Sequence, residues 1–148
     1  MRATRPVLTA GLAAGTLDLI AAIVTSAYYG RSPSWLLKLI ASGFFGSAAF
    51  DGGASTAALG VVFHFVIATG AAAVYYAASR RWPVLTTRPL ACGAAFGIAV
   101  WVFMNLVVLP FSAYPFPSSF RAVGVIRGLL IHIFCVGLPI ALVVRRVR

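Results

Sequence analysis

The stretch PVLTAGLAAGTLDLIAAIVTSAYYG, residues 6–30, is an apolar run long enough to cross a lipid bilayer, and it contains a single carboxylate, Asp18. In a helix, Asp18 lies about 18 Å from the start of the run, near the middle of the bilayer. A charge there costs about 2.5–3.5 kcal/mol on insertion scales, which indicates a functional residue. Gly11 and Gly15 form a GxxxG step, and Asp18 and Ser26 continue much the same face. Because small residues let a second helix approach closely, we predict that Asp18 points into a helix bundle.

The composition indicates a protein that lies almost entirely in the membrane. Of 148 residues, 61% are hydrophobic and only 9% are charged, and the mean hydropathy is +1.00. A soluble domain carries about 25% charged residues. The net charge of +10 could indicate nucleic-acid binding, but the arginines lie at the ends of apolar runs, where membrane topology needs them. We therefore expect the lipid bilayer, and no nucleic acid, as a partner.

Four apolar runs have the length of a membrane span. They cover residues 6–30, 54–79, 89–110 and 122–144. Residues 33–50 are also apolar, but Lys38 and two glycines make them a poor span, so we predict an extra interfacial or re-entrant helix there. Ser32 or Ser34 beside Pro33 is a typical start for that helix. The predicted fold class is all-α: a polytopic membrane protein with one domain, built as a four-transmembrane-helix bundle with one additional helix.

The later spans leave two questions open. The fourth span could start anywhere between Ala122 and Gly128, and Pro139 predicts a kink within it. The second and fourth spans each contain a GxxxH step, ending at His64 and His132, and the first and third each begin with GxxxG. The chain could therefore consist of two copies of one helical hairpin.

Lys and Arg residues are unevenly divided between the two sides of the predicted bundle. Eight lie at the N-terminus, in the turn at residues 80–88 or at the C-terminus. The other side holds four: Arg31, Lys38, Arg121 and Arg127. Since cytoplasmic loops carry the excess of basic residues, we predict that both termini are cytoplasmic.

Several stretches resemble a known group of proteins. These are AGTLDL, IASGFFGSAAFDGG, HFVIATGAAAVYY, GAAFGIAVWVFMNLVVLP and VGLPIALVVRR. They are similar to small bacterial inner-membrane proteins of the YagU-like group, and the resemblance covers most of the chain. It implies four helices and a location in the bacterial inner (plasma) membrane. It supplies no catalytic motif.

Polar residues inside the spans are the candidate binding residues. They are Asp18, His64, Asn105, Arg127 and His132. Asp18 and His64 lie at similar depth on consecutive helices of opposite direction, so we predict that they form a pair. Burial and pairing act on ionisation in opposite senses, and a pair between these effects can exchange a proton near neutral pH. Alternatively, the pair only fixes the register of the two helices.

The depth of the remaining candidates depends on where the fourth span begins. His132 lies near mid-membrane if the span begins near Ala122. If it begins at Gly128, His132 is about 6 Å deep and Arg127 reaches the interface. We expect Asn105 to face Arg127 from the outer end of the third span, where an Asn more often joins helices than binds a ligand.

A b-type haem between His64 and His132 is the one cofactor that the sequence leaves possible. Without a CxxCH motif, covalent haem attachment is excluded. No cofactor is expected otherwise, and whether a metal binds stays open. Cys92 and Cys135 differ by about 9 Å in predicted depth, so we expect free thiols.

No Walker loop, nucleophile elbow or HExxH motif is present, so an enzyme is the least supported class. The observations favour three other functions. The first hypothesis is a transporter or channel-like protein that handles a proton, an ion or a small solute at Asp18 and His64, as a homo-oligomer if it conducts. The second is an electron-transfer subunit with b-haem or quinone. The third is a purely structural accessory subunit.

Overall fold

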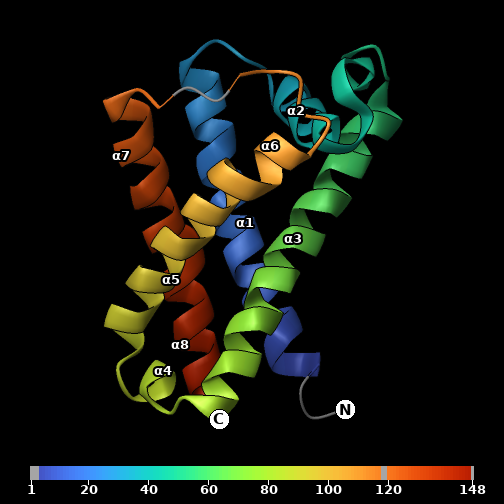
Figure 1. The fold of residues 1–148 in the computed structure, drawn as a ribbon. Helices are drawn as coiled ribbons and strands as arrows, with labels where there is room; N and C mark the ends of the chain where they lie inside the picture. Colours follow the sequence, from blue (N-terminus) through green and yellow to red (C-terminus); the bar gives the residue numbers. More distant parts are fainter. Residues whose placement is uncertain (1–3, 118–119, 148) are drawn as a thin grey trace.

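The computed structural model describes residues 4–117 and 120–147, and within these ranges it contains helices and no strand (Figure 1). Four helical segments there are long and apolar enough to cross a membrane: Thr4–Tyr28, Ala54–Arg81, Pro89–Phe111 and Ala122–Arg146. The predicted all-α, multi-pass membrane bundle is therefore confirmed. Arg2, Ser118, Ser119 and Arg148, which belong to the predicted basic ends and third loop, lie outside the described residues.

The first and second spans are single helices, whereas the third and fourth each contain a π-helical turn. In chain order the elements are α1 (Thr4–Tyr28), α2 (Pro33–Phe45), η1 (Gly46–Phe50), α3 (Ala54–Arg81), α4 (Val84–Thr87), α5 (Pro89–Phe103), η2 (Met104–Val108), α6 (Leu109–Phe111), α7 (Ala122–Ile131), η3 (His132–Gly137) and α8 (Leu138–Arg146). Helix α7 begins at Ala122, which decides between the two predicted starts of the fourth span.

A glycine cap ends α1 and turns the chain towards α2. Gly30 has a φ of +72°, a conformation that only glycine adopts easily. Its N–H donates to the carbonyl of Ala27, and the N–H of Arg31 donates to the carbonyl of Ser26 at 3.0 Å. This pair of bonds is a Schellman motif. It satisfies the last carbonyls of α1 and fixes where Arg31 leaves the helix.

The predicted additional helix is present as α2 followed by the 3₁₀-helical η1. Ser32 is its N-cap, because the side chain accepts a hydrogen bond from the N–H of Trp35 at 3.1 Å, and Pro33 occupies the first turn. Helix α2 has 13 residues and lies across the end of the bundle away from the termini (Figure 1). It packs closely on α3, since a Cβ at Gly60 would meet the carbonyl oxygen of Leu37.

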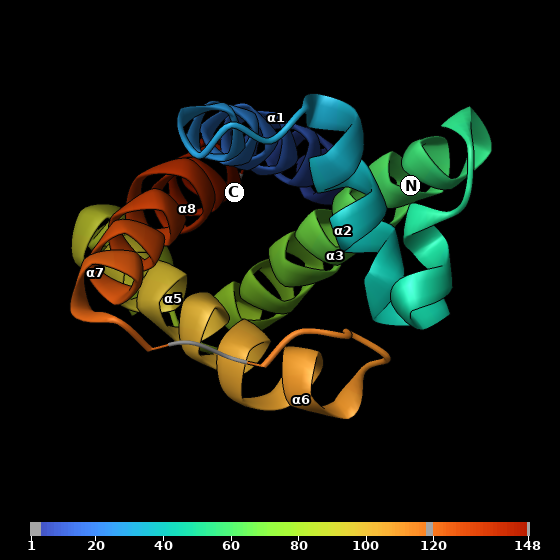
Figure 2. The same cartoon turned by 90° about the horizontal axis from the view of Figure 1, so that it is seen from above.

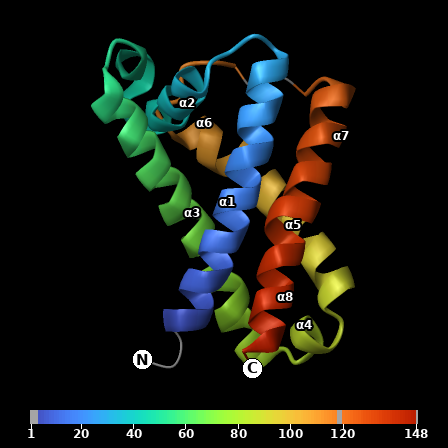
Figure 3. The same ribbon diagram turned by 180° about the vertical axis from the view of Figure 1, so that it is seen from behind.

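Helix α1 lies between α3 on one side and the fourth span on the other, and the fourth span also packs against α5 (Figures 2 and 3). Glycines mediate the contacts of α1 with α3 and of α5 with the fourth span. A Cβ at Gly11 would lie 2.7 Å from the Cα of Thr69 on α3, and one at Gly93 would lie 3.0 Å from the carbonyl oxygen of Gly137. Both GxxxG steps therefore join the helices of their own hairpin, as the suggested duplication requires.

The tightest part of the bundle lies at the end that carries both termini (Figure 1). Its buried residues are Ala10, Ala14, Ala72, Tyr75, Val136, Ile140, Ala141 and Val144. The hydroxyl of Tyr75 donates to the carbonyl of Leu85 at 2.8 Å, which ties α3 to α4. Many large apolar side chains are exposed instead, among them Leu12, Val66 and Leu90. A small-residue core with exposed apolar faces is suited to a lipid surrounding.

Each π-helical turn stands directly before a Leu-Pro pair. Turn η2 ends at Val108, two residues before Pro110, and η3 ends at Gly137, two residues before Pro139. Proline lacks the N–H of the regular ladder and its ring clashes with the carbonyl four residues earlier. Widening the preceding turn relieves that clash, so the distortion predicted at Pro139 takes the form of a π-helix that begins at His132.

Candidate functional site

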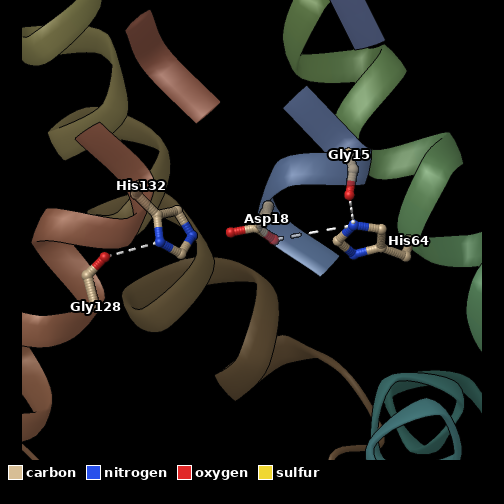
Figure 4. A network of polar contacts seen from close by, with 5 residues as sticks. All are labelled: Gly15, Asp18, His64, Gly128 and His132. Carbon is tan, nitrogen blue, oxygen red and sulfur yellow. Dashed lines mark hydrogen bonds and ion pairs between the residues drawn. The ribbon is translucent and has the colours of Figure 1, made fainter. Parts of the chain in front are cut away.

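Asp18 and His64 lie together between α1 and α3, as the sequence predicts. Oδ2 of Asp18 lies 3.9 Å from Nε2 of His64, and the two side chains are 19% and 12% exposed. The same Nε2 donates to the carbonyl oxygen of Gly15 at 2.8 Å. Because a carbonyl only accepts, Nε2 carries a proton that points at Gly15. Asp18 is therefore in ion-pair range of His64 without a direct hydrogen bond to it (Figure 4).

Gly15 makes this arrangement possible through its missing side chain. A Cβ at this position would lie 2.8 Å from Cδ1 of Phe65 and 3.2 Å from Cβ of Ala68. The ring of Phe65 packs edge-to-face against the His64 ring, with 5.5 Å between the centroids. Gly15 therefore lies in a tight contact between α1 and α3, and this contact brings the imidazole to the Gly15 carbonyl.

His132 approaches Asp18 from the opposite side. Its Nδ1 lies 2.9 Å from the carbonyl oxygen of Gly128, one turn earlier in the same span, so Nδ1 donates and Nε2 is free to accept. The ring faces Asp18 across the bundle in Figure 4. The two histidines are not equivalent copies, because His64 bonds to a neighbouring helix and His132 to its own. The suggested duplication therefore does not extend to the GxxxH steps.

A cavity of about 430 Å³ is lined by both Asp18 and His132, and α2 forms part of its wall. Ser26 is only 8% exposed, and its Oγ has no hydrogen-bond partner although it belongs to the cavity wall. An unpaired buried hydroxyl is costly, so it marks a place where a polar guest can bind. The full lining is Asp18, Ala22, Thr25, Ser26, Tyr29, Arg31, Trp35, Leu36, Leu39, Gly128, Ile131 and His132.

No protein-family model, curated protein or solved structure matches this chain. The site must therefore be understood from its own geometry. The resemblance to the YagU-like group stays a prediction from the sequence.

Arg127 and Asn105 lie elsewhere than expected. Nη1 of Arg127 donates to the hydroxyl of Tyr29 at 2.6 Å, and its guanidinium lies 5.0 Å from the centroid of that ring. Asn105 donates through Nδ2 to the carbonyl of Trp101 at 2.9 Å, within its own span. No hydrogen bond joins Asn105 to Arg127 among the described residues, because the amide bonds to the backbone of its own span and the arginine bonds to α1.

Neither a metal cluster nor a haem is favoured by the donor atoms. Among the described residues, no group of three or more His, Cys, Asp or Glu side chains could hold a metal ion. Cys92 and Cys135 are free thiols. Two axial histidines face each other across the haem iron, yet Nε2 of His64 points at the Gly15 carbonyl and Asp18 lies between the two rings (Figure 4). As arranged, His64 and His132 do not fit a shared haem.

Sequence reasoning missed the aromatic and basic part of the cavity wall. Tyr29, Arg31 and Trp35 come from the end of α1, its cap and the start of α2. The sequence pattern assigns Arg31 only to membrane topology and gives no role to the other two. Only the four-residue spacing of Asp18, Ala22 and Ser26, which places them on one helix face, pointed towards this cavity.

Proposed function

We propose that this protein moves protons, alone or together with a small solute, through a centre formed by Asp18, His64 and His132. The observation that carries the proposal is the position of Asp18. It is the one acidic residue within the described spans, and it lies between two imidazoles in the wall of a cavity (Figure 4). Ionisable residues at this depth mark ion or proton pathways in membrane proteins.

The three side chains provide the parts of a proton relay. Asp18 can take up a proton from the cavity, and the free Nε2 of His132 faces the same space. His64 lies 3.9 Å from the carboxylate, in ion-pair range. A histidine changes its charge close to neutral pH, so small changes around the centre suffice to move the proton.

The shape of the bundle suggests access from one side at a time. The cavity lies towards α2, whereas the small-residue core around Tyr75 and Ile140 closes the end that carries the termini. Transfer across the bilayer would need a second conformation in which this core opens. That is the behaviour of an alternating-access transporter rather than of an open channel.

We infer the location of the protein from its sequence. The resemblance to the YagU-like group supports the bacterial inner membrane, and the basic residues support cytoplasmic termini. A homo-oligomer is part of the same proposal, because the polar route within one protomer is narrow.

The test is proton flux in liposomes containing the purified protein and a pH-sensitive dye. Asp18→Asn keeps the shape and polarity of the side chain but cannot ionise, so flux should fall to the level of empty liposomes. Asp51→Asn is the matched control, since Asp51 is the other acidic residue and lies in an exposed loop. That variant should keep its flux. Equal flux in wild type and Asp18→Asn, with both folded, would show that the centre only fixes helix packing.

A further inference from the structure

A second, larger cavity lies at the α2 end of the molecule. Its volume is about 710 Å³, and its wall comes from the cap of α1, helix α2, the end of η1 and the loop after α6. The lining residues are Arg31, Ser32, Ser34, Trp35, Lys38, Phe50, Tyr114 and Phe116. Arg31 and Trp35 also line the inner cavity, so these two residues form the wall between the cavities.

The charges on this wall are all positive. Arg31 is held over the ring of Trp35, with 4.7 Å from its guanidinium carbon to the ring centroid. Lys38 donates to the carbonyl of Phe50 at 3.3 Å, which uses one of its three N–H groups. In the described part of the chain neither cation forms an ion pair, although Asp51 follows Phe50 directly. Two positive groups therefore face the cavity without a counter-charge.

Hydroxyl groups and aromatic rings complete the wall. Burial raises the pKa of Tyr114 above its ordinary value, so its hydroxyl stays a neutral hydrogen-bond donor at physiological pH. Ser34 lies in the first turn of α2, where backbone N–H groups have no carbonyl partner within the helix. Its hydroxyl is a further donor at the cavity wall. The rings of Phe50 and Phe116 pack against each other, with 5.8 Å between their centroids, and form an apolar side of the cavity.

We propose that this outer cavity binds the phosphate group of a phosphate ester, with Arg31 and Lys38 as the charged ligands. A phosphate offers more acceptor oxygens than a carboxylate, and the donors come from separate elements around the cavity. The aromatic side accommodates a glyceryl or acyl body. The ester comes either from an anionic phospholipid in the surrounding leaflet or from a soluble molecule.

The charged ligands of the outer cavity are different residues from those of the proton centre, although the two cavities share a wall. These ligands lie on the cap of α1 and on α2, whereas Asp18 and His132 lie within the spans. Asp18→Asn should therefore leave binding at the outer cavity unchanged, and the failure of one proposal does not affect the other.

The test is the thermal stability of the detergent-purified protein, titrated with dioctanoyl phosphatidylglycerol, dioctanoyl phosphatidylcholine, glycerol 3-phosphate and decanoate. We expect phosphatidylglycerol, alone or together with glycerol 3-phosphate, to raise the melting temperature in a saturable way. A shift with the lipid alone assigns the source to the bilayer, and a shift with both assigns it to the phosphate ester itself. Increasing salt should weaken the shift, since these charges are partly solvated.

Arg31→Gln and Lys38→Gln should each weaken the apparent affinity about tenfold, because each removes a charged hydrogen bond. Arg80→Gln is the matched control, an exposed arginine near the other end of α3. Lys38→Gln also removes the Lys38 bond to Phe50 and could impair folding. In that case Arg31→Gln alone provides the test. The proposal is overturned if neither phosphatidylglycerol nor glycerol 3-phosphate shifts the melting temperature, if decanoate acts equally well, or if both variants bind like wild type.

Discussion

At the scale of single residues, Ser26 and Asp18 carry the polar character of the inner cavity. Asp18 has the two imidazoles near it, whereas the Oγ of Ser26 has no hydrogen-bond partner in the described structure. A buried hydroxyl without a partner costs about 1–3 kcal/mol. A protein keeps such a group when a ligand or a transported molecule satisfies it for part of the cycle.

Ser26→Ala should leave the purified protein as stable as wild type, or more stable by up to about 1 kcal/mol, while lowering flux in liposomes. Ser42→Ala is the matched control. Ser42 is also buried, but its Oγ donates to the carbonyl of Leu39 at 2.7 Å, so its loss should lower stability and leave the cavity intact. Melting temperatures and flux measured side by side decide the matter. A Ser26→Ala protein that melts lower and transports normally would contradict this role.

The residue scale is also where prediction from sequence was weakest. The depth of Asp18, His64 and His132 follows from counting residues along a helix, so their meeting near mid-membrane could be expected. The hydrogen-bond partner of each imidazole nitrogen could not be predicted. Whether His64 turns to Gly15 or to Asp18, and whether Arg127 reaches Tyr29, depends on rotations of helices that are far apart in the sequence.

At the scale of elements, glycine positions decide which helices touch. Gly15 and Gly70 show the contrast well. A side chain at Gly15 would collide with Phe65, whereas one at Gly70 meets nothing within 4 Å. The sequence contains both glycines in the same kind of apolar helix. Their different roles depend on which face of each helix meets its neighbour.

Gly15→Leu should lower the stability of the bundle by about 1–3 kcal/mol, because the added side chain forces α1 away from α3. It should also weaken the His64 contact with the Gly15 carbonyl and hence proton flux. Gly70→Ala should be neutral or stabilising by up to about 1 kcal/mol, since it removes backbone freedom without a clash. Yield and melting temperature in detergent provide the measurement. A Gly15→Leu protein with wild-type melting and flux would show that this face is open to lipid.

Element boundaries were predicted well where run length and capping chemistry set them. The four spans and the Ser32-Pro33 start of α2 follow from apolar length and from residues that satisfy free helix ends. The π-helical turns were not predictable in register. Proline indicates a disturbance, but which preceding residue begins the wider turn depends on packing against Gly97, where the carbonyl of His132 occupies the place of a side chain.

At the scale of the whole molecule, the two ends of the bundle differ. Both termini and α4 lie at the tightly packed end, and α2 with both cavities lies at the other (Figures 1 and 3). The composition alone could predict a membrane bundle. It could not predict cavities, which arise from the angles between helices.

The proposed orientation predicts which residues a membrane-impermeant maleimide reaches in intact bacteria. In a protein with Cys92 and Cys135 replaced by Ser, Ser47→Cys in η1 should be labelled from outside. Thr87→Cys in α4 should be labelled only after the cells are opened, because the basic turn is on the cytoplasmic side. The cysteine-free protein is the control for background. Labelling of position 87 in intact cells would reverse the orientation.

The two π-helical turns divide the bundle into halves with different mechanics. Helices α1 and α3 have continuous ladders, whereas the third and fourth spans are each interrupted before a proline. The third and fourth spans meet backbone to backbone at Gly93 and Gly137. Because no side chain separates them there, the two spans should bend together. The amide hydrogens of η2 and η3 should then exchange with solvent faster than those at equal depth in α1. If the centre alternates between the two sides, α1 and α3 provide the fixed frame and the later half of the chain moves.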